Sequence, residues 1–445
     1  MKHLRQGERM KKLLVIADDF TGALDTGIQF ASYGARTEIL TDIETNFKDY
    51  PSTEVFIVDT ESRHLESKKA YETVYRLTQN AVNAGIEYLY KKTDSGMRGN
   101  IAAELTAVLN ASGNGFLAFL PAFPEMNRTV EGGISYVDGI PIEKSVFGQD
   151  PFEPVTHSRI REMFEDQKIV KEYSGPEKVE WVPGEKQIAI FDSVTDGDLK
   201  KTAAYLQKRG MLKVAAGCAG CASVIAELLN LSRHEIRLEK VIPPLLIVCG
   251  SMNEISKKQL AYAQNRGYTR ITLSMRQQLE DGYLNSESGS SLLEEMIQIC
   301  RTEGVCMIDT TSERQAIREY MKNEGVKLET ARTEIAERLA EIMAKLTAQG
   351  PELTVMVIGG DTLIHFVRKM KCRQISLLCE LEKGVVYSRM KMQGRSIRVI
   401  SKSGGFGDEA LLVRLIEGMN ARKSERRNEN ADTILLENAR QSIWG

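Results

Sequence analysis

The stretch that decides the fold is KLLVIADDFTGALDTGIQF, residues 12–30. Its apolar run, Leu13–Ala17, predicts a buried strand, and the apolar residues that recur after residue 22 predict a helix. Two carboxylates, Asp18 and Asp19, stand between the strand and the helix. Ligands of open α/β sheets bind at the carboxyl ends of strands, which makes both residues candidates for function. The structural alternative is that one caps the helix and the other is solvated.

The alternation of strand and helix continues along the whole chain, which predicts an α/β protein with mostly parallel sheets. Further strands are predicted at Val55–Asp59, Tyr88–Lys92, Phe116–Leu120, Ile188–Phe191, Leu245–Cys249, Val305–Ile308, Thr354–Ile358 and Ile397–Ile400. Helices are predicted at 66–84, 99–111, 198–209 and 327–349. The polar stretch 231–243 before Pro244 suggests a junction, so we predict two α/β domains, 1–235 and 236–445.

Composition excludes several classes of protein. The 445 residues are 42% hydrophobic and 27% charged with a net charge of -2, which argues against a nucleic-acid or membrane partner. The first ten residues are polar and basic, and the apolar run behind them is too short to span a bilayer. Seven cysteines favour a reducing cytosol over a disulfide framework. We therefore expect a cytoplasmic protein, and the apolar content permits a homodimer.

One cysteine pair, Cys218 and Cys221, forms a CxxC within AAGCAGCAS. No second pair and no nearby histidine complete a zinc site. Packing of small residues is therefore the preferred interpretation over metal or redox chemistry, and the metal ligands of the protein stay unknown.

In the second half, three predicted strands end in glycine with a hydroxyl residue. These ends are Gly250-Ser251, Gly359-Gly360-Asp361-Thr362 and Ser403-Gly404-Gly405-Phe406-Gly407. Glycine lets backbone N–H groups approach an anion, and a helix N-terminus adds about half a positive charge. Three such loops on one sheet edge would cradle phosphates, although turns need glycine anyway. Neither a P-loop nor a dinucleotide fingerprint is present.

In the first half, the predicted strands end in charged residues. Carboxylates accept hydrogen bonds from sugar hydroxyls and can act as a general base. Arginine can bind a carboxylate or a phosphate through two parallel hydrogen bonds. The mixture suits a small polyhydroxy acid, while a surface ion-pair network is the structural alternative for Lys92 and Arg98. The residues that would converge are Asp18, Asp19, Arg63, Lys92, Asp94, Ser95 and Arg98.

The two halves together suggest a phosphotransferase with its active site in the inter-domain cleft. In such enzymes catalysis is mostly positioning and charge stabilisation.

Residues 121–160 are rich in Pro, Gly and polar residues and predict an elaborated loop or hairpin, which in compact domains is often functional.

The chain resembles the four-carbon acid sugar kinase family, formerly a domain of unknown function, over nearly its whole length. Seven ordered motifs carry the resemblance: IADDFTGALDTGIQFA (16–31), DTESR (59–63), KKTDSGMRGN (91–100), YVDGIPIEKSVFGQDPFEPV (136–155), CGSMNEISKKQ (249–259), IGGDT (358–362) and SKSGGFG (401–407). In the third motif, Gly96 and Met97 replace the usual pair of DSTLRGN. The stretch GCAGCA replaces GSAGLA, and Asp361 replaces the glutamate of GGET.

The resemblance implies an N-terminal substrate domain and a C-terminal nucleotide domain. It implies ATP-dependent phosphorylation of the terminal (4-) hydroxyl of a sugar acid, with D-threonate or D-erythronate as first candidates and 3-oxo-tetronate as the alternative. The implied substrate contacts are the seven charged or polar residues given above. The implied nucleotide contacts are Ser251, Gly359, Gly360, Asp361, Thr362 and Gly404, to which the loop adds Gly405 and Gly407.

A mechanism can be outlined from these residues. Arg63 or Arg98 would hold the substrate carboxylate, and Asp19 or Asp94 would accept the proton of the attacking hydroxyl. The glycines of 404–407 would cradle the transferring phosphate, and Mg²⁺ would neutralise its charge. Two other classes stay open: a non-catalytic sensor of sugar acid and nucleotide, and a dehydrogenase, against which the missing dinucleotide fingerprint argues.

Overall fold

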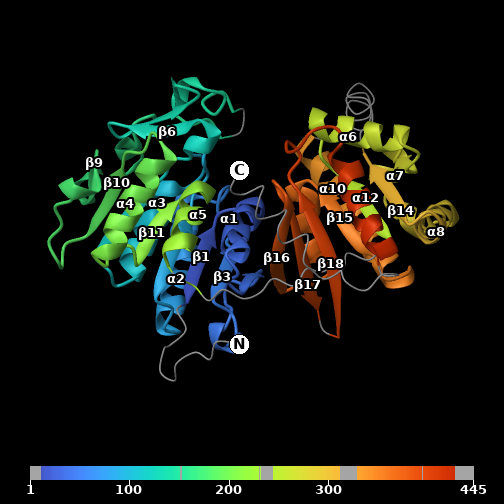
Figure 1. Cartoon of the computed structure of the whole chain (residues 1–445), viewed down its shortest axis with the longest axis horizontal. Helices are drawn as coiled ribbons and strands as arrows, with labels where there is room; N and C mark the ends of the chain where they lie inside the picture. Colours follow the sequence, from blue (N-terminus) through green and yellow to red (C-terminus); the bar gives the residue numbers. More distant parts are fainter. Residues whose placement is uncertain are drawn as a thin grey trace. The chain divides into compact units, whose positions relative to one another are not determined.

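The apolar runs of the sequence become the buried parallel strands of two α/β units (Figure 1). The computed structural model describes residues 12–150, 153–229, 231, 244–310, 328–392 and 394–425. The first unit takes Met1–Ile236, Cys372–Leu381 and Ser388–Gly394, and the second takes Arg237–Lys371, Glu382–Tyr387 and Arg395–Gly445. The predicted junction at 235–236 lies outside the described residues, so the domain boundary stays a prediction, as does the cleft.

The sheet of the first unit runs in the order β16-β2-β3-β1-β4-β11-β5-β10-β9. Only the β16–β2 pairing is antiparallel; the others are parallel. The strands are β1 Leu13–Ala17, β2 Thr37–Leu40, β3 Val55–Asp59, β4 Tyr88–Lys92, β5 Phe116–Leu120, β9 Val170–Tyr173, β10 Gln187–Phe191, β11 Val214–Gly217 and β16 Gln374–Glu382. The helices are α1 Phe20–Ser32, α2 Ser67–Asn83, α3 Ile101–Ala111, α4 Asp196–Lys208 and α5 Ala219–Leu228.

All five residues of each of the strands β1, β3, β4 and β5 are buried, because helices cover the sheet. Two sets of helices do this: α2 packs against α3, and α1 and α4 both pack against α5. The β1 register sets Ala17 beside Asp59 and Ile16 beside Lys91. The loops that follow β3, β1 and β4 are therefore neighbours.

The predicted elaborated loop contains a small antiparallel sheet of its own. Its strands are β6 Arg128–Glu131, β7 Ile134–Val137 and β8 Ile140–Pro141, in that order. The prediction of a hairpin between residues 121 and 160 is confirmed, and Figure 1 shows β6 at the end of the first unit's sheet. This small sheet follows β5 in the chain, and its first residue, Arg128, contacts Ser95 in the loop after β4.

The second unit contains five parallel strands in the order β13-β14-β12-β15-β18. They are β12 Leu245–Cys249, β13 Arg270–Thr272, β14 Val305–Asp309, β15 Thr354–Ile358 and β18 Arg395–Lys402; β17, Val385–Met392, contributes residues to both units. The helices are α6 Glu254–Asn265, α7 Met275–Leu279, α8 Glu287–Thr302, α10 Leu328–Gln349, α11 Gly360–Lys369 and α12 Leu411–Glu425. None of the helices in the described part of the chain has the length and apolarity needed to cross a membrane.

Candidate active site

The predicted site of the first unit is built at the carboxyl ends of β3, β1 and β4, three adjacent strands. Asp18 follows β1 and is buried. Asp19 is the N-cap of α1: its backbone is extended, and its Oδ1 accepts a hydrogen bond of 2.9 Å from the Gly22 N–H. The capping alternative is therefore correct for Asp19. The second carboxylate oxygen of Asp19, Oδ2, faces Arg63.

Arg63 joins the three loops. Its Nε lies 2.8 Å from Asp18 Oδ2, its Nη1 lies 3.0 Å from Asp19 Oδ2, and its Nη2 lies 3.7 Å from Asp94 Oδ1. The guanidinium is only 11% exposed. One cation thus faces three carboxylates and fixes the loops after β1, β3 and β4 relative to one another.

Lys92 ends β4 and is buried against the first turn of α1. Its Nζ lies 3.9 Å from Asp18 Oδ1. A Cβ on Gly22 would lie 2.5 Å from the same Nζ, so glycine at position 22 is what lets the ammonium group approach. The oxygen Asp18 Oδ1 is buried and has no hydrogen-bond partner among the described residues. It is an acceptor ready for a ligand hydroxyl.

Asp94 and Arg98 form a tight pair at the far side of this cluster. Arg98 Nε donates to Asp94 Oδ2 over 2.8 Å, and Arg98 Nη2 donates to Asp94 Oδ1 over 3.2 Å. Both oxygens of Asp94 are therefore occupied. Arg98 Nη1 also lies 3.5 Å from Asp150 Oδ2. Ser95, next in the chain, accepts a hydrogen bond on its Oγ from Arg128 Nη1.

The charges of this cluster stabilise one another. Burial would raise the pKa of Asp18, but the neighbouring cations, Lys92 first, lower it well below its ordinary value. At Asp94 burial is likewise outweighed, here by the hydrogen bond from Arg98 and the charge of Arg63, and the pKa is lowered. Both carboxylates are ionised at neutral pH. They can accept hydrogen bonds but are weak proton acceptors.

The cations respond in the opposite direction. Burial lowers the pKa of Lys92, yet the carboxylates around it, Asp18 first, raise it overall. Burial also lowers the pKa of Arg63, but Asp18, Asp19 and Asp94 together outweigh it and raise the pKa overall. The predicted members of the site in the first unit therefore lie together, and all of them except Ser95 carry a charge, which is the arrangement expected for binding a small polar anion.

The structure adds residues that sequence analysis missed. Lys91 and Glu104 are fully buried beneath the loops, with 3.0 Å between Nζ and Oε2. Ser62 Oγ donates to Glu104 Oε1, and Thr60 hydrogen-bonds Ser62 over 2.7 Å. This network supports the loop after β3 from below. The only residue of this network that the sequence makes conspicuous is Lys91, a charged residue near the end of an apolar strand.

Burial raises the pKa of two further carboxyl groups, Asp59 and Asp25, above the ordinary value of aspartate. Burial raises the pKa of Asp59, the last residue of β3, to about 7. Its Oδ1 accepts from the Glu61 N–H over 3.0 Å, while Oδ2 is buried without a partner in the described part of the chain. Burial also raises the pKa of Asp25 on α1 to about 6. Sequence analysis had singled out neither residue.

In the second unit, the three glycine-rich loops lie side by side because β12, β15 and β18 are consecutive in the sheet. A Cβ on Gly250 would clash with Thr362 Oγ1, and one on Gly404 would clash with Ser251 Oγ. Gly359 has a φ of +118° and approaches the Ser251 backbone N. The structure therefore brings residues of all three loops into contact.

The first turns of α6 hold the third loop in place. Ser256 Oγ donates to Gly404 O over 2.7 Å. Gln259 Nε2 donates to Phe406 O and Asp408 O over 3.0 and 2.8 Å. Gly407 has a φ of +82°, and a Cβ there would clash with Leu411. Gly405 approaches the Asn253 side chain.

The other predicted nucleotide residues open α11, whose N-terminus begins at Gly360. Thr362 is buried, whereas the Asp361 side chain is 74% exposed and pairs with Arg332 over 3.0 Å. Sequence analysis missed Lys402, the last residue of β18. It is buried, its Nζ donates to Ser403 O over 2.9 Å, and burial lowers its pKa to about 8.

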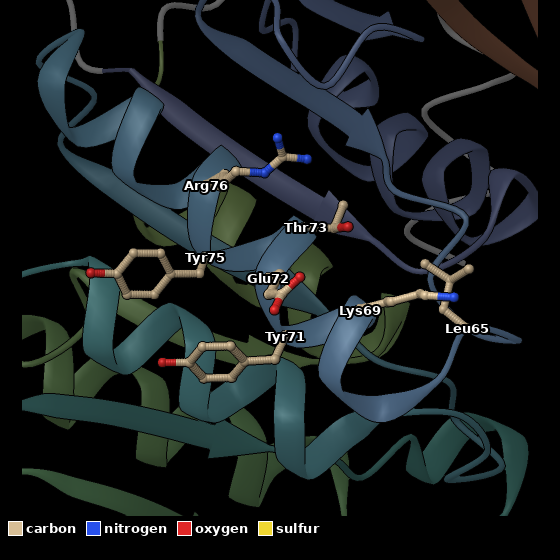
Figure 2. Close-up of a pocket in the computed structure, with 7 residues that line it drawn as sticks. All are labelled: Leu65, Lys69, Tyr71, Glu72, Thr73, Tyr75 and Arg76. Atoms are coloured by element: carbon tan, nitrogen blue, oxygen red, sulfur yellow. The ribbon is translucent and has the colours of Figure 1, made fainter.

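Other features of the first unit lie outside these clusters. The thiols of Cys218 and Cys221 are buried, and burial raises the pKa of each. A hollow of about 550 Å³ lies along α2 (Figure 2), where the rings of Tyr71 and Tyr75 stack. None of the predicted site residues lines it; its lining is Leu65, Lys69, Tyr71, Glu72, Thr73, Tyr75 and Arg76. The hollow is therefore separate from the charged cluster at the strand ends.

The carboxylates of the described residues do not gather into a metal cage of three or more ligands. Asp18, Asp19 and Asp94 already face cations, and Asp361 faces Arg332. A Mg²⁺ ion that enters with nucleotide phosphates needs only one or two protein carboxylates, and this donor set can supply that number.

Comparison with known proteins agrees with a charged cluster in the first unit and glycine-rich loops in the second. A family model described as a sugar-binding N-terminal domain matches residues 13–228, and one described as a nucleotide-binding C-terminal domain matches residues 246–412. Together they span most of the chain and follow the two clusters described above.

Curated relatives extend over nearly the full length. A D-threonate kinase of Salmonella typhimurium is 27% identical, with 90% of this chain and 96% of the relative covered. A D-erythronate kinase of Heliobacterium modesticaldum is 24% identical (86% and 90%), and a 3-oxo-tetronate kinase of S. typhimurium is 22% identical (91% and 98%).

Solved structures share the fold. One from S. typhimurium LT2 has a TM-score of 0.77 at 19% identity and covers 91% of this chain and 98% of its own. One from Haemophilus influenzae has a TM-score of 0.73 at 21% identity, covering 89% and 97%. The α/β fold with a mostly parallel sheet is thereby confirmed.

Proposed function

Because this chain belongs to the four-carbon acid sugar kinase family, we propose that it transfers the γ-phosphoryl group of ATP to the terminal (4-) hydroxyl of D-threonate or D-erythronate. The observation that carries the proposal is the ionised cluster at the ends of β3, β1 and β4. Its carboxylates suit sugar hydroxyls, and its cations suit an acid.

Asp19 is our choice for the residue that accepts the proton of the attacking hydroxyl. Its side chain is 29% exposed, against 3% for Asp18 and 10% for Asp94. The hydrogen bond from Arg98 and the charge of Arg63 lower the pKa of Asp94, which makes it a weak proton acceptor and suits a positioning role better than proton transfer. Asp18, with its unpartnered Oδ1, would accept a hydrogen bond from a substrate hydroxyl.

The three glycine loops of the second unit would bind the phosphates of ATP. The N-termini of α6 and α11 follow two of these loops, and each carries a partial positive charge. Lys402 would add a full charge next to the third loop. When bound, Mg²⁺ would neutralise phosphate charge, with Asp361 as its first candidate among the protein ligands.

A second substrate has support from the relatives. The 3-oxo-tetronate kinase of S. typhimurium aligns with 91% of this chain. A 3-oxo acid of four carbons carries the same carboxylate and terminal hydroxyl, so the same cluster could bind it. The cytoplasmic location and a homodimer stay predictions of the sequence.

The test is coupled ATP turnover with magnesium across D- and L-threonate, D- and L-erythronate and 3-oxo-tetronates. We expect one acid to exceed the others clearly. Asp19→Asn should lower its turnover at least about tenfold, and Asp281→Asn, an exposed carboxylate of the second unit, should leave it unchanged. Nucleotide binding without turnover of any acid would contradict the proposed substrate and favour a sensor. A fully active Asp19→Asn enzyme would reject the proposed base.

A further inference from the structure

The positive charges of the substrate cluster differ in how far protein carboxylates already neutralise them. Arg63 faces Asp18, Asp19 and Asp94. Arg98 is bonded to Asp94 through two nitrogens. The two arginines that the sequence predicts as holders of the substrate carboxylate are therefore both paired within the protein. A ligand carboxylate would have to compete with these pairs.

Arg128 is the exception. It is the first residue of β6, it is half-buried, and its Nη1 donates to Ser95 Oγ. Its Nε is buried and has no hydrogen-bond partner, and no carboxylate of the described residues lies within ion-pair distance. A partly buried guanidinium without an anion is unfavourable, and a bound carboxylate would relieve that cost. Arg128 thus has donors to spare beside a predicted substrate residue.

Phe147 holds this guanidinium in position. The Arg128 Cζ lies 5.1 Å from the centroid of the Phe147 ring, and the Arg98 Cζ lies 5.3 Å from it. The ring also rests on Gly96, where any Cβ would clash with three of its carbons. The unusual glycine of the KKTDSGMRGN motif is therefore what admits Phe147. The ring in turn sets the two arginines around Ser95.

We propose that Arg128 binds the carboxylate of the sugar acid, and that Phe147, seated on Gly96, is a positioning residue for it. The inference rests on the proposed kinase function and deepens it. The carboxylate would lie beside the Arg128–Ser95 pair, where it could accept from the guanidinium and from the Ser95 hydroxyl, whose hydrogen is left free to donate. This arrangement leaves Asp18 and Asp19 to the hydroxyls of the substrate.

The experiment is steady-state kinetics of the preferred acid with wild type, Arg128→Met and Arg128→Lys. We expect Arg128→Met to raise KM for the acid roughly tenfold to a hundredfold, the loss typical of a charged hydrogen-bonded pair, with KM for ATP unchanged. Arg128→Lys should recover part of the loss. Arg159→Met is the matched control, because Arg159 is also half-exposed in the first unit but pairs with Glu172 over 2.8 Å.

A neutral analogue identifies the group that Arg128 recognises. Turnover of the corresponding four-carbon alditol, which lacks the carboxylate, should be weak in wild type and no weaker in Arg128→Met. A variant that lowers acid and alditol turnover by the same factor would overturn the carboxylate assignment. An unchanged KM for the acid in a folded Arg128→Met protein would do the same.

Phe147 and Gly96 give a test that does not remove the arginine. Phe147→Leu and Gly96→Ala should each raise KM for the acid in the same direction as Arg128→Met, whereas Phe147→Tyr should retain near-normal KM. Normal KM in both Phe147→Leu and Gly96→Ala would reject the positioning role. If wild type turns over none of the acids, the proposed function fails; if wild type is active and Arg128→Met is normal, only the present inference fails.

Discussion

At the scale of single residues, Asp59 makes a prediction about stability. Burial raises its pKa to about 7, whereas the unfolded chain releases the proton near 3.8. Between these values the folded state holds a proton that the unfolded state has lost. The contribution of Asp59 to stability is therefore fully present below about pH 4, and it falls as the pH rises to about 7.

The variant Asp59→Asn keeps the acceptor for the Glu61 N–H but cannot ionise. We expect its free energy of unfolding, relative to wild type, to rise between pH 4 and pH 7 by on the order of 2–4 kcal/mol. Denaturant titrations at several pH values measure this difference. Asp281→Asn, at an exposed position, should show no such trend, and a flat difference for Asp59→Asn would contradict the assignment.

Single residues also show where sequence reasoning stops. The positions of Asp18, Asp19 and Lys92 could be predicted because each lies at, or within two residues after, the end of a run that predicts a buried strand. The role of Arg128 could not, because it reaches Ser95 from 33 residues further along the chain, through a small sheet that the sequence predicts only as an elaborated loop or hairpin. Nor does the sequence reveal that Arg63 is already neutralised by three carboxylates, since that depends on the order of the strands.

At the scale of elements, the glycine loops were predictable because β12, β15 and β18 are apolar runs that each end in glycine. The order of the strands, which makes these loops neighbours, was not predictable because it depends on how the crossover connections run between the strands. The strand β2 was missed because four residues carry too little pattern to separate it from a loop. Its partner β16 lies more than 330 residues away in sequence, at a position that local pattern cannot identify.

The contact between two of these loops gives a prediction of its own. A Cβ on Gly404 would clash with Ser251 Oγ, so Gly404→Ala must shift one loop against the other. We expect KM for ATP to rise about tenfold or more, with KM for the sugar acid nearly unchanged. Gly418→Ala, where no atom lies within 4 Å of the added Cβ, is the control and should behave as wild type. Equal effects on both substrates would contradict a specific nucleotide role.

At the scale of the whole molecule, each unit carries one kind of chemistry. Charged side chains gather at the strand ends of the first unit, and glycine backbone with hydroxyls gathers at those of the second. Phosphoryl transfer needs both, because its rate enhancement comes from positioning two substrates and stabilising charge. The first unit is not continuous in sequence, however, since it includes Cys372–Leu381 and Ser388–Gly394.

This discontinuity predicts how the chain responds to division. A fragment of residues 1–236 lacks β16, whose residues Gln374–Leu377 pair with β2. It also loses the hydrogen bonds of Ser376 Oγ to Glu38, and Gly27 loses the Leu377 side chain packed over it. The fragment should therefore expose the edge of β2 and aggregate or unfold at lower denaturant.

Joining residues 372–394 to the same fragment through a flexible linker should restore β16 and, with it, a monomeric fold. Size-exclusion chromatography and urea titration of the two fragments decide the matter. A well-folded, monomeric fragment 1–236 without the added segment would show that the later strands are dispensable. The sugar-binding unit would then be an independent domain that ends where the sequence alone predicts it.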